Sequence, residues 1–390
     1  MVTILGNNLD SVRRHNLSMI LDLVHRHGAV SRATLTRATG LNRSTVAALV
    51  AELVELDLVL EAEPDATNTV GRPSPQVKPR TDRVAIAVNP ELDAITVGVV
   101  GFAGAVLHRV RREVDHAVTP EEAVAIIAEI VADLETDALL GKRVVAIGMA
   151  IPGLVRASDG LVRWAPHLDW VDAPVTELLS AATGYPVVAG NDANLGALAE
   201  HLFGAGRGVR DLIYLNGGAS GIGGGVIANG APFGGVGGYA GEFGQNRPGF
   251  GNRDDRTTPN GTLEDEVSRA RLLAVVGLST ADEPQLQSAL LSSTDPAVRV
   301  ELDRQVRILS VALSNAINVL NPQLVVLGGF LAALYASDPD GLERLVREQA
   351  IAATFEAVQI VPAALGVDLL MIGAAQRAFE TVLEDPASHR

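Results

Sequence analysis

The sequence has no cysteine among its 390 residues, so it can form neither a disulfide framework nor a thiolate zinc site. No run approaches the roughly eighteen consecutive apolar residues that a membrane-spanning helix needs. The first residues also lack the basic start and long apolar stretch of a secretory signal peptide. These absences predict a cytoplasmic protein without membrane segments.

The chain has fewer positive than negative side chains, and its net charge at pH 7 is −15. The charges are distributed unevenly along the chain. Residues 1–50 hold six arginines against two aspartates, a balance of +4 that leaves −19 for the remaining residues. A basic head on an acidic body is suited to docking one end of the molecule on DNA while the body is repelled by the phosphates. At 47% hydrophobic residues, the chain is long enough for two or three domains.

Residues 31–55 have the pattern of a DNA-reading helix-turn-helix. Ser31 is suited to cap a first helix, Gly40 supplies a sharp turn, and Asn42 is suited to cap a second helix. The apolar residues of the second helix recur at i, i+3, i+4 and i+7, as expected for a face packed on a core: Val46, Leu49, Val50 and Leu53. The alternative is a plain pair of helices that serves only packing.

The flanking segments favour the DNA-reading interpretation. An amphipathic helix is expected at 11–27 as a support, with His25 and His27 exposed near its end. Two short strands between residues 58 and 78 would form a wing, which completes a winged helix-turn-helix domain of residues 1–80.

A recognition helix presents its first residues to base edges and phosphates in the major groove. In the wing, Arg72 would enter the minor groove or hold a phosphate, and the alternative is a solvated turn residue. The residues predicted to contact DNA are Ser31, Arg32, Asn42, Arg43, Ser44, Thr45 and Arg72.

The body alternates strand and helix patterns in two similar sets. The first set begins with three consecutive strands and the second with two strands around a glycine hairpin, and helices and further strands follow in each. The expected elements of the first set are strands 84–88, 94–100, 105–110, 144–150 and 187–189, with a helix at 120–136. Those of the second set are strands 212–215, 226–228 and 324–327, a glycine hairpin at 217–225, a helix at 304–320 that stops at Asn321-Pro322, and a final helix at 372–384. The pattern predicts two related α/β lobes with a cleft between them, the first at 83–200 joined by the C-terminal helix 372–385 and the second at 201–371.

Four short motifs occur in an order that resembles the ROK family of sugar kinases and sugar-responsive repressors: residues 191–194, 220–227, 241–244 and 327–329. In the head, residues 14–16 and 71–73 resemble the repressor branch. The resemblance implies a duplicated actin-like, ribonuclease-H-like α/β body of the sugar-kinase type behind the winged head. It also implies a sugar in the cleft, and a homodimer or homotetramer that binds palindromic double-stranded DNA operators.

The resemblance places hydroxyl-binding side chains at six positions of the body: His167, Asn191, Asp192, Glu242, Gln245 and Glu264. Carboxylates and amides suit sugars because they accept from or donate to neighbouring hydroxyls. His167 stands where the family usually has Asn, and Gln245 replaces a His. The alternative is a decayed pocket in which these groups are satisfied structurally.

The parts that a kinase needs are altered. The phosphate-binding turn of the family matches residues 89–93, where Glu91 and Leu92 replace glycines and Asp93 replaces a threonine. These carboxylates would repel a polyphosphate, and the bulk would block its approach. The glycine segment 217–225 is not followed by the Gly-Lys-Ser/Thr of a Walker loop, which favours a tight hairpin over nucleotide binding. ATP is therefore not expected as a cofactor, and the chain is not expected to be an enzyme.

A structural zinc site of the family is altered too. Its four ligand positions match Gln245, Asp255, Thr257 and Thr262, which lack the thiolates and imidazole that such a site uses. No metal is expected, and the loop 246–260 must be ordered by other contacts or be mobile.

These observations favour a DNA-binding transcriptional regulator, expected to be a repressor that responds to a sugar or sugar-derived effector. Two alternatives stay open. One is an ATP-dependent sugar kinase with an added DNA-binding head, and the other is a DNA-binding dimer that responds to no ligand.

Overall fold

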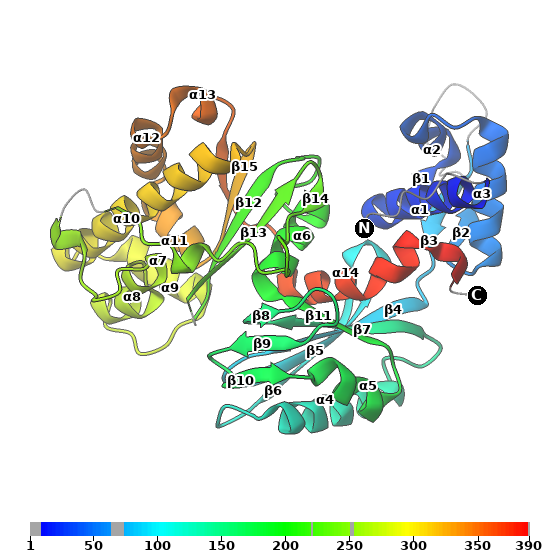
Figure 1. Cartoon of the computed structure of the whole chain (residues 1–390), viewed down its shortest axis with the longest axis horizontal. Coiled ribbons are helices and arrows are strands. Elements are labelled where there is room, and N and C mark those ends of the chain that lie inside the picture. The colour runs from blue at the N-terminus through cyan, green and yellow to red at the C-terminus, as the bar shows by residue number, and fades with distance from the viewer. Residues whose placement is uncertain (1–8, 64–73, 220, 250–252, 389–390) are drawn as a thin grey trace. The chain divides into compact units, whose positions relative to one another are not determined.

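The computed structural model describes residues 9–63, 74–219, 221–249 and 253–388. The chain divides into two units (Figure 1). The first comprises Met1–Ala150, Pro174–Ala189 and Ala374–Arg390, and the second comprises Ile151–Ala173 and Gly190–Gly373. The head thus shares a unit with the first lobe, and the second unit takes in two segments of the predicted first lobe, Ile151–Ala173 and residues 190–200. No described helix is long and apolar enough to cross a bilayer.

The head contains the helix-turn-helix that the sequence predicts. Its helices are α1 (Leu9–His27), α2 (Arg32–Thr39) and α3 (Arg43–Glu55). The side chain of Ser31 accepts a hydrogen bond from the amide of Thr34, and that of Asn42 accepts one from the amide of Thr45, so each caps a helix. Gly40 ends α2 in the left-handed region at a φ of 69°, which glycine adopts without strain.

The wing is a three-stranded antiparallel sheet in the order β1-β3-β2. Its strands are β1 (Val30–Ser31), β2 (Val59–Ala62) and β3 (Gln76–Pro79). The loop between β2 and β3 carries Arg72, which lies outside the described residues, so its DNA contact stays a prediction.

The first unit is built on a five-stranded sheet in the order β11-β7-β4-β5-β6. Its strands are β4 (Arg83–Pro90), β5 (Ala94–Gly101), β6 (Val106–Glu113), β7 (Arg143–Ile151) and β11 (Val187–Asn191), whose last two residues belong to the second unit. Helices α4 (Pro120–Glu135) and α5 (Val175–Thr183) cover one face, and α14 (Leu369–Glu384) covers the other (Figure 1). A Cβ at Gly148 would lie 1.8 Å from the carbonyl oxygen of Ala374, so only glycine lets α14 seat on β7.

The second unit repeats this arrangement with the strand order β14-β13-β12-β15-β16. The strands are β12 (Leu212–Gly217), β13 (Ile222–Ala228), β14 (Ala231–Pro232), β15 (Leu324–Gly329) and β16 (Gln359–Pro362). In both sheets three consecutive strands are antiparallel, and the first of them pairs in parallel with a later strand. The shared order confirms the predicted duplication.

Helices cover both faces of the second sheet. Helix α6 (Asp192–Phe203) packs on one face, and α10 (Pro296–Leu320) with α11 (Phe330–Ser337) packs on the other. Asn321 ends α10 in the left-handed region, where the sequence predicts the stop. The unit also contains shorter helices and a small sheet. The helices are α7 (Leu263–Glu266), α8 (Arg269–Val275), α9 (Glu283–Ser292), α12 (Pro339–Gln349) and α13 (Ala352–Phe355). The strands of the small sheet are β8 (Leu154–Val155), β9 (Val162–Ala165) and β10 (Trp170–Ala173).

The expectation that His25 is exposed is wrong, because its side chain is only 1% exposed. Its Nδ1 accepts a hydrogen bond from the amide of Ala103, and its Nε2 lies 2.6 Å from the side-chain oxygen of Gln376 on α14. The ring packs edge-on against Phe102 and Phe379, which stack on each other. This contact fixes the end of α1 to the lobe of the same unit. His25 lies four residues after a buried leucine of α1, so it extends the apolar stripe of that helix.

Burial lowers the pKa of His25 from 6.5 to about 4. The unfolded chain takes up a proton near pH 6.5 and the folded chain does not, so stability falls as the pH drops from 6.5 towards 4. A shift of this size corresponds to about 3 kcal/mol of unfolding free energy at pH 4. We expect His25→Gln to lose this part of the pH dependence in urea unfolding at pH 7 and pH 4.5. His27→Gln, at the exposed end of α1, serves as the control, and an equal effect of both variants would contradict the account.

Candidate functional site

A pocket of about 400 Å³ lies entirely among residues of the second unit. Its lining comes from the segments around β8 and β9, the start of α6, the described residues where β12 and β13 approach their turn, and two short stretches at 242–245 and 260–265. The lining includes all six residues that the sequence predicts to bind an effector: His167, Asn191, Asp192, Glu242, Gln245 and Glu264. The first three of these residues lie in the predicted first lobe, 83–200, and the last three in the predicted second lobe, 201–371, and the structure places all six in one unit.

Asn191 caps α6 and Asp192 is its first residue, and their side chains make different contacts. The side-chain oxygen of Asn191 accepts a hydrogen bond from the amide of Asn194 at 2.9 Å, and its nitrogen donates to the carbonyl of Gly153 at 3.0 Å. These bonds commit Asn191 to capping the helix. One oxygen of Asp192 accepts from the amide of Ala193 at 2.7 Å and from the side-chain nitrogen of Asn191 at 3.3 Å. Asp192 lines the pocket, and a carboxylate can accept hydrogen bonds from the hydroxyls of a ligand.

Two glutamates and a glutamine form another part of the lining. Glu264 accepts a hydrogen bond from the amide of Ile222 at 3.2 Å and another from the side chain of Gln245. Burial raises the pKa of Glu242, and the nearby charge of Glu264 raises it further. The lining is therefore rich in acceptors, and it suits a ligand that brings hydrogen-bond donors.

Trp164 lines the same pocket, and sequence reasoning missed it. The chain has two tryptophans, of which Trp170 is buried and Trp164 is 49% exposed. An indole face offers an apolar wall with a defined orientation, which complements polar anchors in small-molecule sites. An exposed Trp three residues before the predicted ligand contact His167 was the signal that could have identified it.

Residues 89–93, which match the phosphate-binding turn of the family, comprise the end of β4 and the three residues that link it to β5. The amide of Glu91 donates to the carbonyl of Ala94 at 2.7 Å and so closes the turn on itself. Arg111 lies 3.2 Å from Asp93, 3.6 Å from Glu113 and 3.9 Å from Glu91, so three carboxylates share it. Burial raises the pKa of Glu91. The leucine at position 92 is mostly exposed where the family turn has a glycine.

The glycine segment 217–225 forms a hairpin with a shorter turn than the sequence predicts. Strand β13 begins at Ile222, so the hairpin turn is shorter than 217–225; Ser220 within it lies outside the described residues. A Cβ at Gly225 would lie 2.6 Å from the Cβ of Ala197 on α6, and one at Gly224 would lie 2.4 Å from the ring of Phe243. The glycines thus let α6 and the loop of Phe243 approach the strand closely.

The helix-turn-helix exposes the start of α3. Asn42, Arg43 and Ser44 are exposed, and Thr45 is half-buried. Asn42 also accepts a hydrogen bond from the hydroxyl of Ser44 at 2.7 Å. Within the described part of the chain, Arg43 has no hydrogen-bond or ion-pair partner, so its guanidinium is available to a ligand.

Two other predicted DNA contacts, Ser31 and Arg32, are engaged within the protein. Ser31 caps α2, and Arg32 is half-buried and paired with Glu61 of β2. A phosphate contact by Arg32 would have to replace that ion pair. Arg43 is therefore the candidate that the structure leaves most accessible.

Comparisons with known proteins identify the family. The sequence profile of the ROK family matches residues 86–380. The chain belongs to the ROK family.

A xylose repressor of Caldicellulosiruptor bescii is 23% identical over 396 residues, which cover 96% of this chain and 98% of that protein. A glucokinase of Thermotoga maritima is 30% identical over 251 residues, which cover 60% of this chain and 78% of that protein. A solved ROK family transcriptional regulator, described as a homologue of the E. coli MLC protein, matches with a TM-score of 0.77 at 22% identity and covers 96% of this chain and 97% of that one.

The fold expectation is confirmed by this structural match, which extends over the head as well as the ROK body. The body is the actin-like α/β fold of ROK sugar kinases, preceded by an N-terminal helix-turn-helix domain. The similarity to the glucokinase covers a smaller part of the chain than the similarity to the repressor. The ROK body is similar to those of both transcriptional regulators and sugar kinases. The residues of the site must therefore indicate which of these two classes the chain resembles in function.

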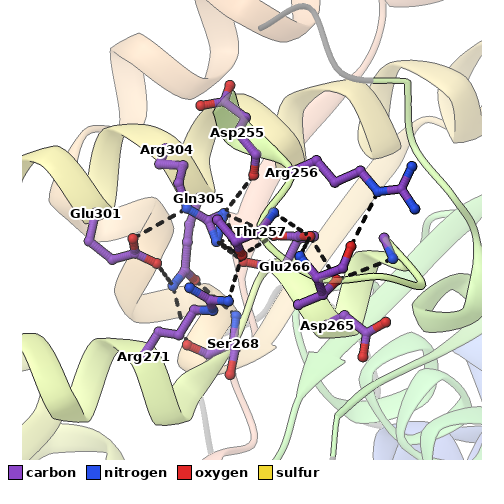
Figure 2. A network of polar contacts seen from close by, with 12 residues as sticks. Asp255, Arg256, Thr257, Asp265, Glu266, Ser268, Arg271, Glu301, Arg304 and Gln305 are labelled. Carbon is purple, nitrogen blue, oxygen red and sulfur yellow. Dashed lines mark hydrogen bonds and ion pairs between the residues drawn. The ribbon is translucent and has the colours of Figure 1, made fainter. Parts of the chain in front are cut away.

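The residues at the zinc positions of the ROK family do not fit a zinc ion in this chain. The carboxylate of Asp255 is paired with Arg307 at 2.7 Å. The hydroxyl of Thr257 donates to Glu266 at 2.7 Å (Figure 2). Thr262 caps α7, and Gln245 donates to Glu264. None of the four is a thiolate or an imidazole, and each has a protein partner.

Proposed function

We propose that this chain is a transcriptional repressor of the ROK family that binds operator DNA through its head and a sugar-like effector in the pocket of its second unit. The observation that carries the proposal is the similarity to xylose repressors over 96% of the chain, head included. An effector shifts DNA binding only by its different affinities for the binding and non-binding conformations. Selection of bound DNA from a random pool tests the proposal, and a failure to enrich any sequence would contradict it.

The chemistry of the pocket supports a neutral polyhydroxylated effector. Asp192, Glu242 and Glu264 contribute carboxylates, which accept from hydroxyl groups. An anionic phosphate about 4 Å from one carboxylate would be repelled by roughly 1 to 4 kcal/mol at effective dielectric constants of 80 to 20. We therefore propose a free pentose or hexose rather than a sugar phosphate. The relatives named xylose repressors make D-xylose the first candidate.

We propose that the repressor acts as a dimer on a palindromic operator. Two-fold symmetric binders of this type meet two half-sites about one helical turn of DNA apart. The selected DNA would then contain an inverted repeat, and selected sites without one would contradict a dimer.

We expect no sugar kinase activity. The turn at residues 89–93 uses the amide of Glu91 internally and carries the carboxylates of Glu91 and Asp93 where phosphates would bind. Phosphoryl transfer depends on positioning and charge stabilisation, which such a turn does not supply. A coupled ADP-release assay with common hexoses and pentoses checks this, with a ROK glucokinase assayed in parallel. Sugar-dependent ADP release that Asp192→Asn abolishes would contradict the proposal.

A further inference from the structure

We propose that Glu266 and Arg304 are positioning residues of the effector pocket, which hold the segment 255–266 in place by protein contacts where the family has zinc. The part that concerns the effector rests on the proposed function. The part that concerns the metal does not.

Glu266 is the centre of a polar network in the second unit (Figure 2). Its side chain is fully buried. Its carboxylate accepts from the amide and hydroxyl of Thr257 at 2.9 and 2.7 Å, and from the amide and hydroxyl of Thr258 at 2.8 Å each. Arg304 adds two contacts at 3.2 and 3.4 Å. One carboxylate thus fixes two successive residues of the loop.

Arg304 ties this loop to the long helix α10. Its guanidinium donates to the backbone carbonyls of Glu266 at 3.0 Å and Asp255 at 3.2 Å, and to the side chain of Glu301 at 3.3 Å. A second arginine of the same helix, Arg307, pairs with the carboxylate of Asp255 at 2.7 Å. Arg304 and Arg307 therefore hold the loop against α10 at two points. These contacts order the described part of the loop 246–260 without a metal.

The network reaches the pocket through the short helix α7. Residues two apart in an α-helix project about 200° apart, so Glu264 and Glu266 lie on opposite sides of α7. Glu264 lines the pocket and accepts from the amide of Ile222, while Glu266 faces the network. Thr262 at the start of the helix and Asp265 within it also line the pocket. A displacement of Glu266 would shift all three of these pocket residues.

The charges at this place favour the ion pair and oppose a metal. Burial alone would raise the pKa of Glu266, but the hydrogen bonds from Thr257 and Thr258 outweigh it and lower the pKa. The groups that contact the Glu266 carboxylate are hydrogen-bond donors, and the guanidinium of Arg304 carries the opposite charge. A dication here would face the positive charges of Arg304 and Arg307, and it would compete for oxygens that already accept hydrogen bonds.

The test compares Glu266→Gln and Arg304→Met with Arg299→Met in the full chain. Arg299 lies on the same helix in exposed pairs with Asp303 and Asp338, so it is a matched control for the loss of an arginine. Breaking the buried pair is expected to lower the Tm by roughly 10 °C, whereas the control leaves it unchanged.

At a temperature where each variant is folded, calorimetric titration with D-xylose and D-glucose should show affinity about tenfold weaker in the two network variants. Elemental analysis of the wild type should find zinc far below one atom per chain, and EDTA should leave its Tm unchanged.

Several results would overturn the inference. Stoichiometric zinc together with a fall of the Tm in EDTA would show that a metal holds the loop. A lowered Tm with unchanged sugar affinity would show that the network does not position the pocket. If the two variants fail to fold, Thr258→Val removes one hydroxyl donor and should give a smaller loss of Tm and affinity together. A wild type that binds no sugar would contradict the proposed effector, while the zinc, EDTA and Tm measurements would still decide the inference about the metal.

Discussion

Asp192→Ala is expected to abolish the release of operator DNA at sugar concentrations that release it from the wild type, while leaving operator affinity without sugar unchanged. Asp192 is the carboxylate at the start of α6 that lines the pocket, and its neighbour Asn191 is committed to capping that helix. Hydrogen bonds to a charged group contribute about 1.5 to 3 kcal/mol, so sugar affinity should fall about 10- to 150-fold. Calorimetric titration and fluorescence anisotropy with labelled operator measure the two effects.

The control for this variant is Asp172→Ala. Asp172 is an exposed partner of Arg163 and does not line the pocket. It should respond to sugar like the wild type. A normal sugar response of Asp192→Ala would show that the effector binds elsewhere, and a loss of operator affinity without sugar would show that Asp192 supports the fold instead.

Arg43→Ala is expected to weaken binding to the selected operator and to relax the preference at one base position. Its guanidinium is exposed at the start of α3 and has no partner in the described part of the chain. A bidentate contact of arginine to a base is worth about 1 to 3 kcal/mol, which corresponds to a loss of about 5- to 150-fold. Anisotropy titrations with the operator and with single-base variants measure both effects.

Arg13→Ala provides the comparison for this variant. Arg13 pairs with Glu52 of α3 at 2.8 Å, so its loss should affect the seating of the recognition helix and weaken all DNA sequences alike. If Arg43→Ala kept the full base preference of the wild type, the assignment of α3 as the reading helix would be wrong.

The sequence was sufficient where the signal is local or repeated. The caps Ser31 and Asn42 and the turn at Gly40 lie within a few residues of the groups that they serve, so the helix-turn-helix could be predicted with its ends. The two lobes could be predicted because the same order of strands and helices occurs twice. The six effector candidates came from the family resemblance, and the structure brings them into one pocket, although their binding of a sugar stays a prediction.

Partnerships between distant residues could not be predicted. His25 is separated from Gln376 by 351 positions, so nothing near it in the sequence indicated a buried partner. Glu266 and Arg304 are 38 positions apart, and either would be expected on a solvated face if considered alone. Strand β13 was predicted to start too late because its first glycines resemble a turn, whereas they are needed for close packing against α6.

The central claim is that sugar binding in the second unit controls DNA binding by the head. The most direct measurement is the fluorescence anisotropy of a selected operator with the full chain, titrated with D-xylose and a panel of other free sugars and sugar phosphates. The account predicts that at least one free sugar releases the DNA, that the phosphates do not, and that Asp192→Ala is unresponsive. Tight operator binding that no sugar alters would contradict the claim and favour a DNA-binding dimer without a ligand.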